Sequence, residues 1–258
     1  MNKGKNKMRL QGKVAIVTGS GRGIGRSIAL SLAREGAAIV VNDVDADVAE
    51  SVCQEIQDMG GSAAICVVGV GTKAAADALV RTALASLSGL HILVNNAGIT
   101  RDAMIHKMTE EQWDEVIKVH LRGLFLNTQA ALRVMREQAY GKIINVTSVS
   151  GTRGNIGQAN YATAKMGVVG FTLACARELA RYKINVNAIS PVAATRMFID
   201  IPDKIRIPAE EAIARESVLQ RLGTADDVAP LAVFLASDES SYLTGQIIGA
   251  TGGPMNLL

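Results

Sequence analysis

The chain has 258 residues, 48% of them hydrophobic and 20% charged, so it can bury a sizeable core and extensive disorder is excluded. The net charge of +3 is concentrated in four basic residues near the start. The near-neutral remainder and the 3% aromatic content argue against a nucleic-acid surface. We expect no membrane span, no secretory signal and no metal site, and therefore a cytoplasmic protein with free thiols.

Short apolar runs alternate with longer amphipathic segments along the chain. The runs predict strands at 14–18, 38–42, 63–67, 91–94, 142–147, 184–190 and 246–249. The segments predict helices near 24–36, 46–59, 73–88, 109–138, 159–181 and 226–237. This alternation indicates an α/β fold with a doubly wound parallel sheet of about seven strands, covered by helices on both faces. We predict one domain over 10–258, a flexible basic tail over 1–9, and a substrate flap at about 196–219.

A glycine-rich segment follows the first predicted strand and opens the first predicted helix. Glycines let a backbone approach a pyrophosphate, and the free N–H groups at a helix start attract its charge. An ordinary tight turn is the alternative, but the strand–loop–helix context favours a dinucleotide site. The residues concerned are Gly19, Ser20, Gly21, Arg22, Gly23, Ile24 and Gly25.

The second predicted strand ends at Asp43, which bears on the choice of dinucleotide. A carboxylate at this place can accept hydrogen bonds from the ribose hydroxyls and repel a 2′-phosphate, which favours NAD over NADP. Arg22 is the opposing indication, because a cation in the glycine loop could meet a 2′-phosphate. A helix-capping or turn acid is the alternative for Asp43.

Tyr161 and Lys165 are four residues apart on a predicted helix and therefore share one face. An ammonium roughly 5–6 Å from the phenol, at an effective dielectric of about 20, would lower the phenol pKa by about 2 units. Such a tyrosine can exchange protons near neutral pH. Ser148 follows the fifth predicted strand, where its hydroxyl can steady charge on a substrate oxygen. A packing aromatic, a solvated lysine and a turn serine are the alternatives.

Together these motifs resemble the short-chain dehydrogenase/reductase family over about residues 10–253. The resemblance rests on Thr18-Gly19-x3-Gly23-x-Gly25, Asn95-Asn96-Ala97-Gly98, Ser148, Tyr161-x3-Lys165 and Gly249-Ala-Thr-Gly-Gly253. Segments 95–102 and 157–165 look most like bacterial 3-oxoacyl-thioester (3-oxoacyl-ACP) reductases. The resemblance implies a Rossmann-like fold, a homotetramer, and hydride transfer between a nicotinamide and a carbonyl or carbinol carbon. It also implies that Asn95, Ala97 and Gly98 lie against the cofactor.

Several positions depart from the family pattern. His120 stands where many relatives carry an asparagine that links the lysine to a water relay. Its imidazole could pass a proton or hold the relay water, or it could be a packed histidine whose backbone carbonyl does that work. A similar histidine occurs in dehydrogenases that resemble 3-hydroxyacyl-CoA dehydrogenases.

Two further departures concern the cofactor. Val192 follows Pro191 where many relatives have glycine, and the segment to Thr195 is one residue shorter than in the reductases. By resemblance, Pro191, Val192 and Thr195 help to hold the nicotinamide amide. Gly69 replaces a family aspartate that binds adenine, which leaves that role to the backbone and Val70.

We therefore predict an NAD(H)-dependent oxidoreductase that interconverts a ketone and a secondary alcohol. A 3-oxoacyl or 3-hydroxyacyl thioester of CoA or ACP is the leading substrate class. A small cyclic, aromatic or steroid-like alcohol is the alternative substrate, and a non-catalytic dinucleotide-binding regulator is the alternative of another class. Substrate contacts are expected from Ser148, Ser150, Gln158 and Tyr161. Helices near 109–138 and 159–181 are the expected assembly surfaces.

Overall fold

The computed structural model describes residues 8–193, 211, 214–215 and 217–253. Within these residues a sheet of seven parallel strands forms in the order β3-β2-β1-β4-β5-β6-β7. Each strand lies within one residue of its predicted ends, which confirms the predicted fold class. The strands are β1 (Val14–Val17), β2 (Ala38–Asp43), β3 (Ala63–Val67), β4 (Ile92–Asn95), β5 (Gly141–Val146), β6 (Ile184–Pro191) and β7 (Ile247–Ala250).

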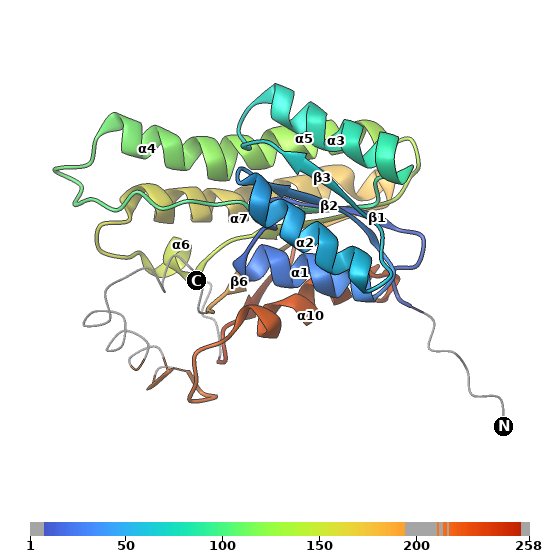
Figure 1. Cartoon of the computed structure of the whole chain (residues 1–258). Coiled ribbons are helices and arrows are strands. Elements are labelled where there is room, and N and C mark those ends of the chain that lie inside the picture. The colour runs from blue at the N-terminus through green and yellow to red at the C-terminus, as the bar shows by residue number, and fades with distance from the viewer. Residues whose placement is uncertain (1–7, 194–210, 212–213, 216, 254–258) are drawn as a thin grey trace.

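Helices cover both faces of the sheet, as Figure 1 shows. The alternating side chains of a strand point to opposite faces, so β1 sends Ala15 and Val17 into one core and Val14 and Ile16 into the other. The first core packs against α1 (Gly23–Arg34), α2 (Ala46–Asp58) and α10 (Ala225–Ala236). The second packs against α3 (Lys73–Leu87), α5 (Gly123–Met135) and α7 (Ala159–Leu179).

The strand order reverses between β1 and β4, which are hydrogen-bonded neighbours. In open α/β sheets the loops at such a reversal run in opposite directions and leave a crevice at the carboxyl ends of the strands. The loops that follow β1, β4 and β5 therefore meet at one edge of the sheet. The glycine loop follows β1, the Asn95–Gly98 segment begins at the last residue of β4, and Ser148 follows β5.

The helix predicted near 109–138 is interrupted in the structure. It consists of α4 (Glu110–Ile117), a π-helical turn (Lys118–Arg122) and α5. A π turn holds an extra residue, a local feature that hydrophobic periodicity does not reveal, and such turns are frequent at functional sites. Here it contains His120, whose side chain is buried.

Smaller differences occur at three places. The helix predicted near 159–181 is α7 followed by a 3-10 turn (Ala180–Tyr182), and another 3-10 turn (Asp238–Ser240) follows α10. The short helix α6 (Val149–Arg153), with Ser148 as its N-cap, was not predicted. Its few residues carry too little periodic signal to be distinguished from a loop.

Arg9 belongs to the folded domain, although the sequence placed it in the tail. Its guanidinium lies 2.6 Å from the Glu35 carboxylate, and its backbone N–H donates to the same side chain at 3.2 Å. Residues 1–7 of the predicted tail lie outside the described residues. None of the described helices is long and apolar enough to cross a membrane.

Most of the predicted flap at 196–219 also lies outside the described residues. Its last part is described, and there the Ser217 hydroxyl and the Leu219 backbone N–H both donate to the carbonyl of Gly252, at 3.1 and 3.0 Å. The end of this segment is therefore attached to the loop that follows β7.

Candidate active site

The glycine loop brings the start of α1 directly onto the end of β1. A Cβ at Gly25 would lie 2.1 Å from the Gly19 carbonyl oxygen, and one at Gly19 would lie 2.9 Å from Ala97 Cα. Arg22, the N-cap of α1, makes no side-chain capping bond. The first backbone N–H groups of α1 therefore have no capping acceptor from that side chain, an arrangement suited to an anionic ligand.

Asp43 lies at the carboxyl end of β2 beside this loop. One carboxylate oxygen accepts from Gly21 N at 3.1 Å, and the other accepts from Val44 N at 2.9 Å. Arg22 pairs with Asp45 at 2.5 Å. The N-cap residue of α2 is Asp45, so Asp43 does not cap that helix.

The segment after β4 is fastened to the end of β1. The Thr18 hydroxyl accepts from Asn96 N and Ala97 N at 3.0 and 3.1 Å. The Asn96 amide donates to the carbonyls of Thr18 and Gly19 at 2.9 and 3.0 Å. Because these bonds join two adjacent strand ends, they hold Ala97 against the glycine loop.

Asn95 lies in a buried polar network that crosses the sheet. Its amide donates to Asn145 at 3.0 Å and its carbonyl oxygen accepts from Asn127 at 3.2 Å. Asn145 donates in turn to Thr172 on α7 at 2.9 Å. This network ties α5 and α7 to the two central strands, so Asn95 steadies the sheet beneath the site.

Ser148, Tyr161 and Lys165 come together at the end of β5. The Lys165 ammonium lies 5.5 Å from the centre of the Tyr161 ring and donates to Val146 O at 2.8 Å. The Ser148 and Tyr161 side chains are hydrogen-bonded. The prediction that the tyrosine and lysine share one helix face is therefore correct.

The charges of this trio differ from the sequence expectation. Burial lowers the pKa of Lys165 to about 7. Burial also raises the pKa of Tyr161, with Asp102 acting in the same direction and the hydrogen bond from Ser148 lowering it. The predicted fall in the phenol pKa is thus wrong for these protein groups on their own. The prediction counted the attraction between the two charges but left out the cost of removing each from water.

His120 reaches the trio from the π turn. Its Nε2 lies 2.8 Å from Ile99 O and 3.1 Å from Ile99 N, and its ring meets the Tyr161 ring edge-on with centroids 5.2 Å apart. Burial, with the Lys165 charge adding to it, lowers the pKa of His120 to about 3. The imidazole is therefore neutral at physiological pH.

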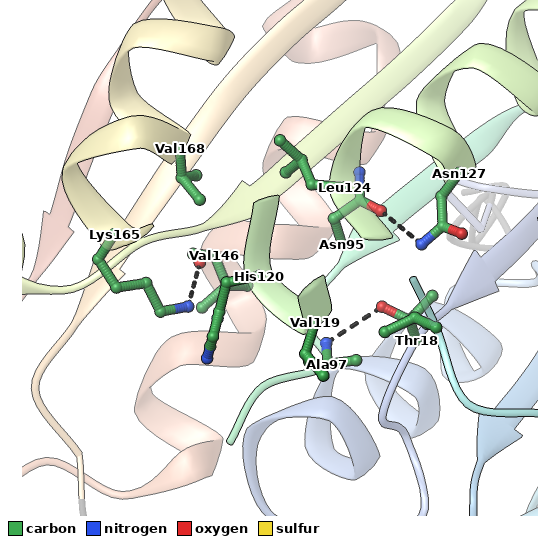
Figure 2. Close-up of a pocket in the computed structure, with 11 residues that line it drawn as sticks. Thr18, Asn95, Ala97, Val119, His120, Leu124, Asn127, Val146, Lys165 and Val168 are labelled. Atoms are coloured by element: carbon green, nitrogen blue, oxygen red, sulfur yellow. Dashed lines mark hydrogen bonds between the residues drawn. The ribbon is translucent and has the colours of Figure 1, made fainter. Parts of the chain in front are cut away.

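A small cavity of about 10 Å³ lies beside Lys165 and His120. Figure 2 shows Lys165 and His120 projecting toward it from α7 and the π turn. This volume is about what one buried water needs. Its lining also includes Thr18, Val70, Asn95, Ala97, Asn127 and Val146.

The other predicted cofactor residues are only partly placed. Pro191 ends β6, and Val192 N donates to Ala250 O at 2.9 Å. Ala193 then pairs with Gly223, so the path after Pro191 stays attached to the sheet, while Thr195 lies outside the described residues. Gly69 is exposed, and Val70 lines the cavity.

The predicted substrate residues lie near the trio. Ser150 lies in the first turn of α6, and its backbone N–H donates to the Ser148 hydroxyl at 3.1 Å. The Gln158 amide donates to Asp102 at 3.0 Å and accepts from Asn155 at 3.1 Å. Both of its polar atoms therefore already have protein partners.

Sequence reasoning missed Asn160, the residue before Tyr161. It is fully buried. Its amide donates to the carbonyls of Arg101 and Gln112 at 3.0 and 3.1 Å, and its carbonyl oxygen accepts from Tyr161 N at 2.8 Å. These bonds fasten the β4–α4 loop and the start of α4 to the first turn of α7. The only signal in the sequence was an asparagine inside a helical segment, which is equally typical of an exposed position.

The described residues contain no group of three or more His, Cys, Asp or Glu side chains placed to hold a metal ion. Cys53 and Cys66 are buried free thiols, and Cys175 is a half-buried one. None of these cysteines belongs to the Ser148–Tyr161–Lys165 trio.

Comparison with known proteins agrees with this geometry. Residues 19–254 match the family described as enoyl-(acyl carrier protein) reductase. The chain is 43% identical over 251 residues to the 3-oxoacyl-[acyl-carrier-protein] reductase FabG of Thermotoga maritima, covering 95% of this chain and 99% of that protein. The chain belongs to the short-chain dehydrogenase/reductase family.

Two more relatives extend the comparison. The BbsD subunit of (2S)-[(R)-hydroxy(phenyl)methyl]succinyl-CoA dehydrogenase from Thauera aromatica is 38% identical, covering 95% of this chain and 98% of that protein. A crystal structure described as a short-chain alcohol dehydrogenase from Sinorhizobium meliloti matches with a TM-score of 0.90 at 34% identity, covering 96% of this chain and 98% of that one. The predictions of the family, the Rossmann-like fold and a nicotinamide-dependent oxidoreductase are confirmed.

Proposed function

We propose that this chain interconverts 3-oxoacyl and 3-hydroxyacyl thioesters, carried on ACP or CoA, with NAD(H) as its nicotinamide cofactor. The observation that carries the proposal is the Ser148–Tyr161–Lys165 trio at the end of β5. It stands in a chain that is similar over 95% of its length to a 3-oxoacyl-ACP reductase. A reductase or dehydrogenase of this class needs a proton donor and an oxyanion partner beside the reacting carbon.

The residues at the crevice fit a dinucleotide. The close approach of Gly19, Gly25 and Ala97 leaves backbone rather than side chains at the start of α1, where a pyrophosphate would be held. Asp43 would bind the adenine ribose, Val70 would lie near adenine, and Pro191, Val192 and Thr195 would hold the nicotinamide amide. When bound, the nicotinamide supplies or takes up the hydride.

The chain's own residues manage the proton. In reduction, the Tyr161 hydroxyl donates its proton to the substrate oxygen, and in oxidation the phenolate takes it back. Ser148 donates a hydrogen bond to the same oxygen and steadies the negative charge that forms there. Lys165, 5.5 Å from the Tyr161 ring, favours the phenolate when it is protonated. Its pKa of about 7 makes this help depend on pH near neutrality.

The preference for NAD rests on the charges around the adenine ribose. Asp43 faces the glycine loop, and Arg22, the cation in that loop that could receive a 2′-phosphate, is paired with Asp45. An added phosphate would meet two carboxylates and a cation that is already neutralised.

Asp43→Ala should narrow the ratio of kcat/KM for NADH over NADPH by about tenfold, because one charged hydrogen-bond partner of the ribose is lost. Asp45→Ala is the matched control, since it frees Arg22 without touching Asp43. It should raise kcat/KM for NADPH, whereas Asp43→Ala acts through the ribose contact of NADH. An unchanged ratio in Asp43→Ala would show that this carboxylate does not read the ribose.

A secondary alcohol with an aromatic group on a CoA thioester is the second candidate substrate. It is favoured by the 38% identity to the Thauera aromatica dehydrogenase subunit, whose substrate combines both features. A screen of NADH oxidation should compare acetoacetyl-CoA, an aryl 3-oxoacyl-CoA and simple cyclic ketones. Turnover of the ketones with neither thioester consumed would overturn the thioester proposal.

We also propose that the chain forms a homotetramer through its α5 and α7 faces. Phe125 on α5 is 46% exposed, and Leu173 on α7 is 44% exposed, which is unfavourable on a monomer surface but ordinary in a subunit contact. Light scattering on a sizing column should give a mass of four chains. A single-chain mass would overturn this part of the proposal.

A further inference from the structure

His120 joins three parts of the site. Its backbone belongs to the π turn, its Nε2 lies within hydrogen-bond distance of both backbone groups of Ile99, and its ring meets Tyr161 edge-on. A neutral imidazole carries its single proton on one of two ring nitrogens. With the proton on Nε2 it donates to Ile99 O, and without it Nε2 accepts from Ile99 N. Either tautomer therefore holds the Ile99 backbone.

Gly98 is shaped by the same imidazole. A Cβ on Gly98 would lie 2.4 Å from Cε1 of His120, and the three nearest atoms to it all belong to that ring. Its φ angle is not in the left-handed region that glycine favours. Space rather than backbone conformation therefore requires glycine at this position.

We infer that His120 is a positioning residue, which wedges the 97–99 segment apart from the Tyr161 ring and sets the distance between the cofactor crevice and the phenol. This inference rests on the proposed function, because it assumes that the cofactor lies on the side of the 97–99 segment and the substrate on the side of Tyr161. The imidazole holds both sides in place and does not carry the proton. Titratable groups that face it are Tyr161 and Lys165 on α7, and its low pKa agrees with a neutral wedge.

The first test is a double-mutant cycle on Gly98→Ala and His120→Ala. Gly98→Ala alone should weaken NADH binding at least tenfold and lower Tm by about 5 °C, because the methyl group collides with the ring. In the double variant the ring is gone, so the added methyl group should cost nothing further, and the double variant should bind NADH about as tightly as His120→Ala alone. Coupling of this kind is expected only for residues in direct contact. Losses that simply add in the double variant would overturn the inference.

The second test separates positioning from proton transfer. His120→Phe keeps a ring against Tyr161 but loses the bond to Ile99. We expect kcat to stay within about threefold of the wild type while the Kd for NADH rises about tenfold, the scale of one hydrogen bond. The midpoints of the kcat–pH profile should not move. A fall in kcat beyond a hundredfold at unchanged Kd would make His120 a proton carrier and overturn the inference.

These readouts also separate this inference from the proposed function. If the wild type binds NADH but consumes neither thioesters nor ketones, the proposed function fails while the binding cycle still decides the role of His120. Titration of NADH fluorescence and thermal unfolding of the four proteins of the cycle need no substrate. A double variant that matches His120→Ala in both NADH affinity and Tm supports the wedge, and a further loss in either quantity rejects it.

Discussion

Two clusters built from the same residue types lie at opposite edges of the sheet. At the amino edge, Tyr140 donates to Asp238 at 3.0 Å, Lys13 lies 3.7 Å over the Tyr140 ring, and Lys142 donates to Asn185 at 2.9 Å. His91 accepts from Val14 N at 3.0 Å. At the carboxyl edge, His120, Tyr161 and Lys165 form the candidate site.

The two clusters differ in how their charges are compensated. Burial lowers the pKa of Lys142, and the charge of Asp238 offsets part of this fall while that of Lys13 adds to it. Lys165 lies more deeply in the protein and is held by a backbone carbonyl, and burial lowers its pKa to about 7. A carboxylate near a buried lysine stabilises the charged form of that lysine. Without such a carboxylate, the pKa of a buried lysine falls toward physiological pH. The two edges therefore differ in the depth of burial of the lysine and in the presence of a carboxylate near it, rather than in residue type.

The largest expected effect contrasts the two tyrosines. Tyr161→Phe should lower turnover by at least a thousandfold, because the general acid is removed, and leave the Kd for NADH within twofold. Tyr140→Phe should keep full turnover and lose stability, because Asp238 loses its phenol donor. Steady-state NADH oxidation and NADH titration measure both. Retention of more than a tenth of the rate in Tyr161→Phe would contradict the mechanism.

Replacing the two lysines sharpens the comparison. Lys165→Met should lower kcat about a hundredfold, while Lys142→Met should leave it unchanged. The unfolded lysine titrates near 10.5 and the folded Lys165 near 7, so the unfolded chain binds more protons between these values. Keeping Lys165 then costs about 4 kcal/mol at pH 7.5, a cost that fades as the pH rises to 10.5.

Lys165→Met should therefore melt several degrees above the wild type at pH 7.5 and lose this advantage by about pH 10. Thermal unfolding across that range checks both statements. If the variant melts no higher than the wild type at pH 7.5, other interactions offset the free-energy cost of burying Lys165, and the contrast between the two edges fails.

His120 gives the next effect, in the dependence of stability on acid. The unfolded histidine takes up a proton near pH 6.5, whereas the folded one does so only near 3. Stability from this group is therefore complete above pH 6.5 and falls by about 2 kcal/mol by pH 5. His120→Phe should lose that much less on acidification. His91, whose pKa is also lowered by burial, acts alike in both proteins and cancels.

Urea unfolding of the wild type and His120→Phe at pH 7.5 and 5.0 measures the difference directly. Equal losses of unfolding free energy in the two proteins would show that its surroundings do not hold the His120 imidazole neutral. His120 and His91 would then not distinguish the two edges.

The smallest effect belongs to the amino edge. Asp238→Asn keeps an acceptor for Tyr140 but removes the charge near Lys142, which should cost about 1 kcal/mol, the scale of one hydrogen bond. The value of kcat should not change. A loss of turnover would mean that the amino-edge cluster acts on the site through the sheet, and the two edges would no longer be independent.

The sequence by itself determined the ranges of the seven strands to within one residue, the glycine loop, Asp43 at the end of β2, and the shared face of Tyr161 and Lys165. These features depend on periodicity and on residues close together in the chain, so they are local in origin. Motif order was enough to indicate the family and its class of reaction.

Only the tertiary structure decided the π turn at His120, the hold of Asn160 on the β4–α4 loop, and the direction of the Tyr161 pKa. Each involves contacts between segments distant in the chain, and the Tyr161 pKa depends on how far those segments remove the phenol from water. The sequence showed which charges could attract one another. Packing determined the cost of desolvating them, and at the carboxyl edge burial raises the pKa of Tyr161 although Lys165 lies beside its ring.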